Sequence, residues 1–406
     1  MRDPEFVAYS PDYNTQMLYF TCSSLIEDDS YLFEISDRGG HPNVWVRNLN
    51  SSTVCQLSDN RASYQKSYVY FDGEPSKGLA KASVALDSAH GIVYYIQDNV
   101  VYQADRNGIR KTLSKIENGE MTAFCHVSSD GLRICVPTVD GRALDFDPQT
   151  EGTGLDKRPA YNIDERIQKE HLCSYLNVFS TETGVLLFRQ RIPNAWITHV
   201  QFCPTNNNLI LFNNEWPYRD CGIRRIWLSD GERFWQVRKE GGGRSRKDWV
   251  CHEMWTSDGS AIIYHGAYQN GPAFVGRIRL SDGLCQEIPL PNEYNAYGHF
   301  NISKRGTLVC DGYFKMPHDK ETVRENSTDN GPDPHKKIAK YICQIQADWE
   351  KKTLSWIPLC KHETDWLGQD SHPHPIFDHA GRYIYFSSRR EKTIGIYRIL
   401  TQQGGV

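Results

Sequence analysis

Residues 252–266 read HEMWTSDGSAIIYHG: an apolar stretch, a polar turn containing Asp-Gly, and a second apolar stretch. Short alternating runs on either side of such a turn are typical of a β-hairpin. The same pattern recurs along the chain, so the fold is a repetition of one hairpin unit. The other copies lie at 84–97, 126–138, 199–214, 299–312 and 374–388.

Each hairpin is followed or preceded by a second pair of strands, in which an alternating strand leads through a turn to a more polar one. These outer halves lie at 44–58, 100–113, 176–190, 226–237, 276–288, 342–359 and 394–400. Residues 20–36 are expected to supply the first half of the first unit. Repeats of about 40–50 residues, each with four short strands, are typical of β-propellers. We therefore predict an all-β fold, a seven-bladed β-propeller in a single domain.

The predicted propeller domain spans residues 7–406, because residues 1–6 (MRDPEF) resemble a remnant of an expression vector. Two stretches interrupt the repeat and are predicted to be inserted surface loops. The first, 147–172, is charged, and a short helix is expected near 163–170. The second, 315–338, is polar and rich in Asn, Asp, Lys and Pro. No second domain is recognised.

The amino-acid composition argues against some classes of binding partner. Apolar residues make up 39% of the 406 residues and aromatic residues 12%, which is enough for a large core. A net charge of −4 argues against binding to nucleic acid or to a membrane surface through bulk charge. The twelve cysteines are scattered without a Cys-x-x-Cys pair, so we interpret them as buried reduced thiols and expect a cytoplasmic protein. A monomer or a weak homo-oligomer is expected.

Alignment of the hairpins on their turn residues gives the sharpest prediction about a site. The turn residues are Asn206, Gly259, Gly306 and Gly381. Seven residues before them lie His199, His252, His299 and His374. The first strand of each propeller blade lines the central channel, so four imidazoles are predicted to meet at one channel mouth. The alternative for any single one of them is a packed or hydrogen-bonded histidine without a ligand.

Residues 369–374 (QDSHPH) add further donors beside this mouth. In an extended segment His372 and His374 face the same side, and Pro373 restricts the segment to a strand start or edge. Together with His299 and the amide of Gln369, these two imidazoles form a neutral set of ligands. Such a set suits a divalent metal such as Mn²⁺, Zn²⁺ or Ca²⁺, and the residues alone do not choose among them.

Four segments of the chain resemble the oligogalacturonate lyase family, polysaccharide lyase family 22. The segments are 220–230 (DCGIRRIWLSD), 251–260 (CHEMWTSDGS), 298–312 (GHFNISKRGTLVCDG) and 369–387 (QDSHPHPIFDHAGRYIYFS). The resemblance implies a seven-bladed propeller with manganese at the channel. It implies these metal ligands: His299, Gln369, His372 and His374. It places the catalytic histidine at His252 and the catalytic arginine at Arg225, with Arg224 as the alternative one position earlier.

The resemblance also implies the reaction, a β-elimination that breaks a 4-O-linked uronate and leaves a 4,5-unsaturated product. His252 would remove the C5 proton, while the metal and Arg225 hold the substrate carboxylate. The expected partner is a uronate-containing oligosaccharide. The candidate substrate-binding residues are His199, Arg224 and Glu215, although His199 and Glu215 also suit structural roles.

Several departures from the family pattern keep other functions open. Residues 212–215 read FNNE, where the family carries a histidine–glutamate pair after Phe-Cys, and the first 80 residues match weakly. One alternative is a lyase with the same mechanism that acts on a glucuronate-containing oligosaccharide, such as a rhamnosyl-glucuronate. A second is a non-catalytic propeller scaffold that binds proteins. A peptidase-like propeller is disfavoured because no Gly-x-Ser-x-Gly motif is present.

Overall fold

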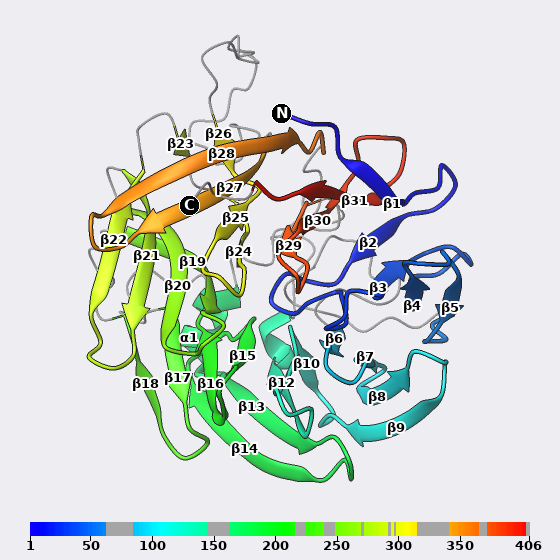
Figure 1. Ribbon diagram of the computed structural model, residues 1–406. Helices are drawn as coiled ribbons and strands as arrows, with labels where there is room; N and C mark the ends of the chain where they lie inside the picture. The colour runs from blue at the N-terminus through cyan, green and yellow to red at the C-terminus, as the bar shows by residue number, and fades with distance from the viewer. Residues whose placement is uncertain are drawn as a thin grey trace, which may run out of the picture.

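The computed structural model describes residues 1–61, 84–144, 163–215, 225–238, 248–268, 272–290, 294–295, 298–314, 341–364 and 372–402. Within these residues, seven antiparallel sheets of four or five strands are arranged in a ring around a central axis (Figure 1). Six of the sheets follow the order of the chain from an inner strand to an outer one, and the seventh ends on the N-terminal strand. The predicted all-β, seven-bladed propeller is confirmed.

The first three blades come from the N-terminal third of the chain. Blade 1 contains β2 (Thr15–Met17), β3 (Tyr31–Ser36), β4 (Asn43–Asn48) and β5 (Val54–Gln56). Blade 2 contains β6 (Val84–Asp87), β7 (Ile92–Gln97), β8 (Val100–Asp105) and β9 (Arg110–Lys115). Blade 3 contains β10 (Glu120–Thr122), β11 (His126–Val127), β12 (Arg133–Asp140), β13 (Cys173–Ser180) and β14 (Leu186–Pro193).

The next three blades carry most of the predicted site residues. Blade 4 contains β15 (Val200–Cys203), β16 (Asn206–Asn213), β17 (Ile226–Ser229) and β18 (Phe234–Gln236). Blade 5 contains β19 (Asp248–Trp255), β20 (Ala261–Tyr268), β21 (Ala273–Arg279) and β22 (Cys285–Pro289). Blade 6 contains β24 (Phe300–Ile302), β25 (Leu308–Cys310), β27 (Tyr341–Asp348) and β28 (Thr353–Lys361). A separate pair is formed by β23 (Tyr294–Asn295) and β26 (Tyr313–Phe314).

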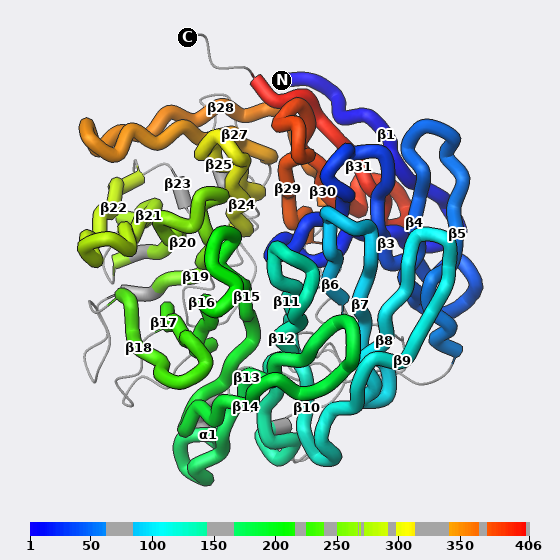
Figure 2. Tube along the Cα trace, turned by 60° about the horizontal axis from the view of Figure 1, so that its bottom comes forward, coloured from blue at the N-terminus to red at the C-terminus, as the bar shows by residue number. Residues whose placement is uncertain are grey.

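Blade 7 closes the ring with strands from both ends of the chain. It contains β29 (Ile376–Phe377), β30 (Tyr383–Ser388), β31 (Gly395–Leu400) and, outermost, β1 (Glu5–Ala8). Glu5 pairs with Arg398 and Phe6 with Tyr397, and Figure 2 shows β1 beside β31. Glu5 and Phe6 fall in the stretch that we interpreted as vector-derived. The ordered propeller therefore begins two residues before the boundary predicted at residue 7.

The first half of blade 1 differs from the prediction. The inner strand β2 ends at Met17, before the predicted start at residue 20, and the next residues turn into the channel. There the ring of Tyr19 stacks on Phe124 at 3.6 Å between centroids, and Phe20 is 1% exposed. An apolar run that fills a channel has the same composition as a buried strand, so the sequence pattern does not separate the two.

The one α-helix among the described residues is α1 (Ile163–Glu170), which confirms the short helix expected at that place. It follows the 3₁₀ helix η2 (Gly141–Leu144), and its Ile167 is fully buried. The rest of the first predicted insertion, residues 147–162, and the whole of 315–338 lie outside the described residues. Among the described helices, none combines the length and the apolar character needed to cross a membrane.

Candidate active site

Blades 4 and 6 carry their histidines at equivalent positions. Each histidine directly precedes the inner strand and lies opposite a polar residue at the end of the second strand. In blade 4 the backbone N–H of His199 donates to Asn213 Oδ1 at 2.7 Å. In blade 6 the backbone N–H of His299 donates to Asp311 Oδ1 at 2.5 Å. The register predicted from the hairpin alignment is therefore present in the backbone of both blades.

His252 and His374, in blades 5 and 7, share a different backbone feature. Their φ angles are +52° and +47°, in the left-handed region that residues other than glycine rarely adopt. In β19 this conformation accompanies a bulge between Cys251 and Met254. A bulge breaks the alternation of side chains, so the consecutive residues His252 and Glu253 both reach buried polar partners. His252 contacts blade 6, whereas Glu253 contacts blade 4.

Three imidazoles form a compact buried cluster at the channel. One donor nitrogen from each of His299, His372 and His374 lies within 4.8 Å of the others. The ring centroids of His299 and His374 are 4.1 Å apart, and all three residues are at most 6% exposed. Three converging imidazole nitrogens are a donor set for a borderline divalent cation. The predicted fourth ligand, Gln369, lies outside the described residues.

A buried carboxylate orients this cluster. Asp311 Oδ2 lies 2.9 Å from His299 Nδ1 and accepts the backbone N–H of His374 at 3.2 Å. Because a carboxylate only accepts, Nδ1 of His299 carries the proton, and its lone pair is on Nε2. A histidine that binds a metal through one ring nitrogen usually donates a hydrogen bond from the other, often to a carboxylate. Nε2 is thus the nitrogen of His299 that is suited to bind a cation.

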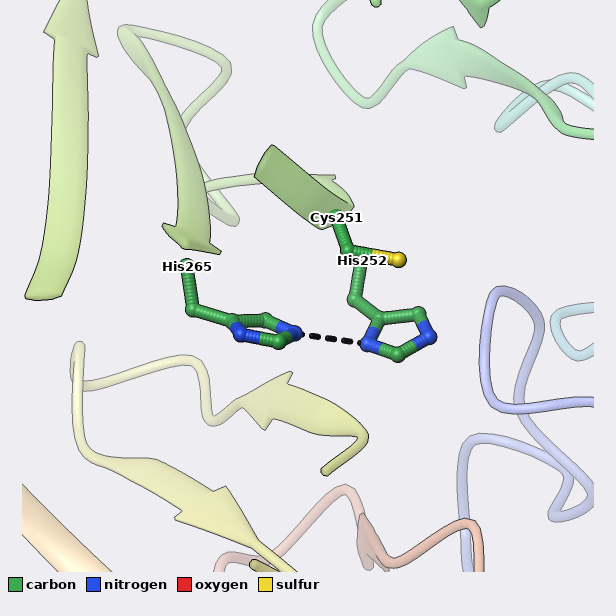
Figure 3. Close-up of side chains that lie close together, drawn as sticks. All are labelled: Cys251, His252 and His265. Carbon is green, nitrogen blue, oxygen red and sulfur yellow. Dashed lines mark hydrogen bonds between the residues drawn. The ribbon is translucent and has the colours of Figure 1, made fainter. Parts of the chain in front are cut away.

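His252 adjoins the cluster as a neutral imidazole. Its ring centroid is 4.5 Å from that of His299, and the residue is 5% exposed. Its Nδ1 lies 2.7 Å from the carbonyl oxygen of Gly298 and 2.7 Å from His265 Nε2 (Figure 3). The carbonyl only accepts, so Nδ1 carries the proton and Nε2 has the lone pair.

Burial, followed by the nearby His299, His265 and Arg225, holds the pKa of His252 well below its usual value. The charged form of an imidazole is disfavoured in such a place because burial removes its solvation and positively charged neighbours repel it. His252 is therefore neutral near pH 7, with one nitrogen that can accept a proton.

Arg225 lies at the centre of a buried ion-pair group. Its Nη1 lies 2.8 Å from Glu215 Oε1, and its Nε lies 2.8 Å from Glu253 Oε2. Burial opposes the charge of Arg225, but Cys251 and the two carboxylates raise its pKa well above the usual value. Burial also raises the pKa of Glu253, but Arg225 and a hydrogen bond from His199 outweigh it and lower the pKa to about 2. The group is therefore fully ionised near neutral pH.

His199 belongs to this ion-pair group. Its Nδ1 lies 3.4 Å from Glu253 Oε1, and its Nε2 lies 3.2 Å from the hydroxyl of Tyr19. The ring of Tyr19 in turn lies 5.0 Å from that of His374. Tyr19 thus connects the ion-pair group of blade 4 with the histidine cluster of blades 6 and 7.

The predicted site residues therefore fall into two adjoining groups. The first contains His252, His299, His372 and His374, and the second contains Arg225, Glu215 and His199. Arg224 and Gln369 lie outside the described residues. This arrangement places a neutral base between a candidate cation site and a buried guanidinium, which is suited to removing a proton next to an anionic group.

Comparisons with known proteins identify similar sequences and similar folds. No family model matches the chain. The oligogalacturonate lyase of Dickeya dadantii (strain 3937) is 25% identical over 206 residues, which are 48% of this chain and 47% of the relative. The chain thus spans about half the length of this relative in the match. The resemblance to the oligogalacturonate lyase family is confirmed.

Two solved structures extend the similarity of fold to nearly the whole chain. An oligogalacturonate lyase in complex with manganese superimposes with a TM-score of 0.72 at 17% identity, over 99% of this chain and 97% of that one. An oligogalacturonate lyase from Vibrio parahaemolyticus gives a TM-score of 0.72 at 18% identity, over 97% of this chain and 93% of that one. At these identities the two structures support the propeller fold.

Sequence reasoning missed several residues of the site. Asp311 directly follows the second strand of blade 6, opposite His299, so the hairpin alignment contains a signal for it. His265 lies on the second strand of blade 5, opposite Cys251, which directly precedes the predicted His252. Glu253 follows His252 directly, and the alternation of side chains along a strand predicts that it points away from the channel. Tyr19 and Phe20 carry no signal of their own, because they reach the channel from a loop.

We predict that Arg225→Met destabilises the fold strongly. The substitution leaves Glu215 and Glu253 buried without their cation, which costs about 3–5 kcal/mol of unfolding free energy at pH 7. Urea denaturation measures this loss. Glu253→Gln, which leaves Arg225 paired with Glu215, is the control and should cost less.

The pH dependence of this loss has a defined sign. In the wild type the pKa of Glu253 is lowered from 4.5 to about 2, so its contribution is present above pH 4.5 and is lost as the pH falls toward 2. In Arg225→Met the carboxylates protonate at higher pH, so the deficit relative to wild type shrinks below about pH 5. A deficit under about 1 kcal/mol at pH 7, or one that grows on acidification, contradicts the ion-pair account.

Proposed function

We propose that this chain is a metal-dependent lyase that cleaves 4-O-linked uronate oligosaccharides by β-elimination. The observation that carries the proposal is the buried convergence of the neutral His252 with the cluster of His299, His372 and His374. This convergence joins a base to a set of cation ligands, which is the pair of functions that the reaction requires. The relative in Dickeya dadantii is an oligogalacturonate lyase, which supports oligogalacturonate as the substrate.

His299, His372 and His374 would hold the divalent metal, with Gln369 as the fourth ligand predicted from the sequence. The manganese in the similar oligogalacturonate lyase structure supports Mn²⁺. Zn²⁺ also suits imidazole ligands, whereas Ca²⁺ prefers a shell of oxygens and fits this donor set less well. A bound divalent cation would neutralise the substrate carboxylate and stabilise the negative charge that develops when C5 loses its proton.

His252 would act as the base. Its Nε2 accepts the proton from C5, while the Gly298 carbonyl holds Nδ1–H and fixes the orientation of the ring. The electrons of the C5–H bond form the C4–C5 double bond, and the C4–O bond breaks. The leaving oxygen takes a proton either from His252 directly or from solvent, and in the second case His252 releases the C5 proton to solvent, so that the enzyme returns to its starting charge. A neutral imidazole suits this exchange near neutral pH.

Arg225 would supply the second positive group near the substrate carboxylate. Glu215 and Glu253 already occupy its Nη1 and Nε, so the guanidinium is fixed before substrate arrives. A guanidinium has five N–H donors, and those not used by the glutamates remain for a substrate oxygen. We propose that Glu215 and His199 act on the substrate through Arg225. Arg224 is the alternative guanidinium one position earlier.

A second candidate substrate is a glucuronate-containing oligosaccharide, such as a rhamnosyl-glucuronate. The observation that favours it is Asn214, which stands where the family carries the histidine after Phe-Cys and is buried beside Glu215. Different side chains at this place would change the contacts to a sugar hydroxyl while the base and the cation ligands remain the same. The non-catalytic scaffold is the third alternative, and an activity assay separates it from both lyases.

The assay for the proposed function is incubation with oligogalacturonides and, separately, with glucuronate-containing oligosaccharides. We expect the ultraviolet absorbance of a 4,5-unsaturated uronate to appear with one of the two classes. Chelation should abolish the signal and added Mn²⁺ should restore it, because the cation neutralises the carboxylate. No product from any uronate in the presence of Mn²⁺ would reject the lyase function.

We predict that His252→Gln loses at least about 100-fold in turnover, because general-base catalysis contributes roughly that much or more. The variant should keep the metal content of the wild type, since His252 is not among the proposed ligands. His90→Gln is the control, because His90 has a side chain that is 57% exposed in blade 2. Turnover within about threefold of wild type in His252→Gln would remove His252 from the base role.

A further inference from the structure

A second cluster of donor atoms includes the proposed base, His252, and two residues next to it. One atom from each of Cys251, His252 and His265 lies within 4.8 Å of the others, and the three residues are at most 8% exposed. Figure 3 shows the sulfur of Cys251 beside the ring of His252, and the ring of His265 directed at the same imidazole. None of these atoms is needed to bind the metal proposed above.

The backbone explains why three donors meet here. Cys251 and His265 are paired directly across β19 and β20, so their side chains project from the same face of the sheet. His252 is the next residue and would normally face the other way. Its φ of +52° at the bulge keeps it within reach of both neighbours. The three residues of the cluster therefore all lie on two paired strands, and none of them lies in a loop.

The donor types differ from those of the histidine cluster. Thiolate and imidazole are both zinc ligands, and a thiolate favours Zn²⁺ over Mn²⁺. The carbonyl oxygen of Gly298, 2.7 Å from His252 Nδ1, offers a further oxygen at the same place. The buried charges nearby also favour a cation, because two carboxylates, Glu215 and Glu253, face the single guanidinium of Arg225.

We propose that Cys251, His252 and His265 form a second binding site, for a thiophilic divalent cation such as Zn²⁺, and that its occupation inhibits the enzyme. Binding releases the thiol proton of Cys251 to solvent and forms one metal–sulfur and two metal–nitrogen bonds. The His252 proton moves from Nδ1 to Nε2, because Nδ1 then binds the cation. Nε2 can no longer accept a proton from C5. The inhibition rests on the proposed lyase function, whereas the binding site does not.

Cobalt tests the site without any assay of activity. The metal-free full chain is titrated with Co²⁺, which replaces Zn²⁺ and gives a near-ultraviolet charge-transfer band when a thiolate is bound. We expect two equivalents of Co²⁺ to bind to wild type, with the thiolate band arising from one of them. Cys251→Ser should bind one equivalent and lose the band. His265→Phe, which keeps the thiol, should lose the band as well.

Cys203→Ser is the matched control, because Cys203 is also a buried thiol but lies in blade 4 outside the cluster. This variant should keep the band. Absence of a thiolate band in wild type at excess Co²⁺ overturns the proposed site, and so does a band that persists in Cys251→Ser. Loss of the band in Cys203→Ser would assign the thiolate to a different place and would also overturn the proposal.

The inhibition is tested separately on Mn²⁺-loaded protein. Added Zn²⁺ should lower the rate of unsaturated-uronate formation in wild type to that of His252→Gln, and Cys251→Ser should resist it. Equal inhibition of the two proteins would place Zn²⁺ in the histidine cluster and overturn the inhibitory role. If no uronate is cleaved at all, the lyase function fails, and the cobalt titration still decides whether the site exists.

Discussion

The pairing register of the two inner strands in each blade is the constraint on which the site depends. Ring closure brings the start of every inner strand to one channel, and the register decides which side chain stands there. In blades 4 and 6 the opposite residue, Asn213 or Asp311, accepts the backbone N–H of the histidine and fixes its place. A slip of one residue would turn the imidazoles to the other face of the sheet.

The electrostatics follow from that geometry. Four imidazoles form one group at the channel, and in the adjoining group Arg225 is held between two carboxylates. Asp311 adds a further buried carboxylate behind His299. Buried charges are tolerated only when they are paired, and here the carboxylates outnumber the guanidinium. This excess of buried negative charge favours the binding of a cation at the channel.

Much of this could be predicted from the sequence, because hairpin repeats and their register are local patterns. The six inner hairpins, the helix at 163–170 and the convergence of His252 with His299 and His374 all follow from spacing. The spacing of residues in the sequence does not predict the left-handed φ of His252. This φ lets Glu253 reach Arg225 in another blade. Nor does the spacing predict that Phe20 leaves the strand pattern to fill the channel. Both depend on contacts between blades, which no single repeat encodes.

We propose that His299, His372 and His374 bind a divalent cation, and that His252 beside them acts as the base without binding it. Anomalous diffraction from a crystal of the chain grown with Mn²⁺ tests this most directly. We predict one manganese peak within bonding distance of His299, His372 and His374, with the ring of His252 nearby but not coordinated. A peak bound to His252, or no peak at the histidine cluster at saturating Mn²⁺, would contradict the account.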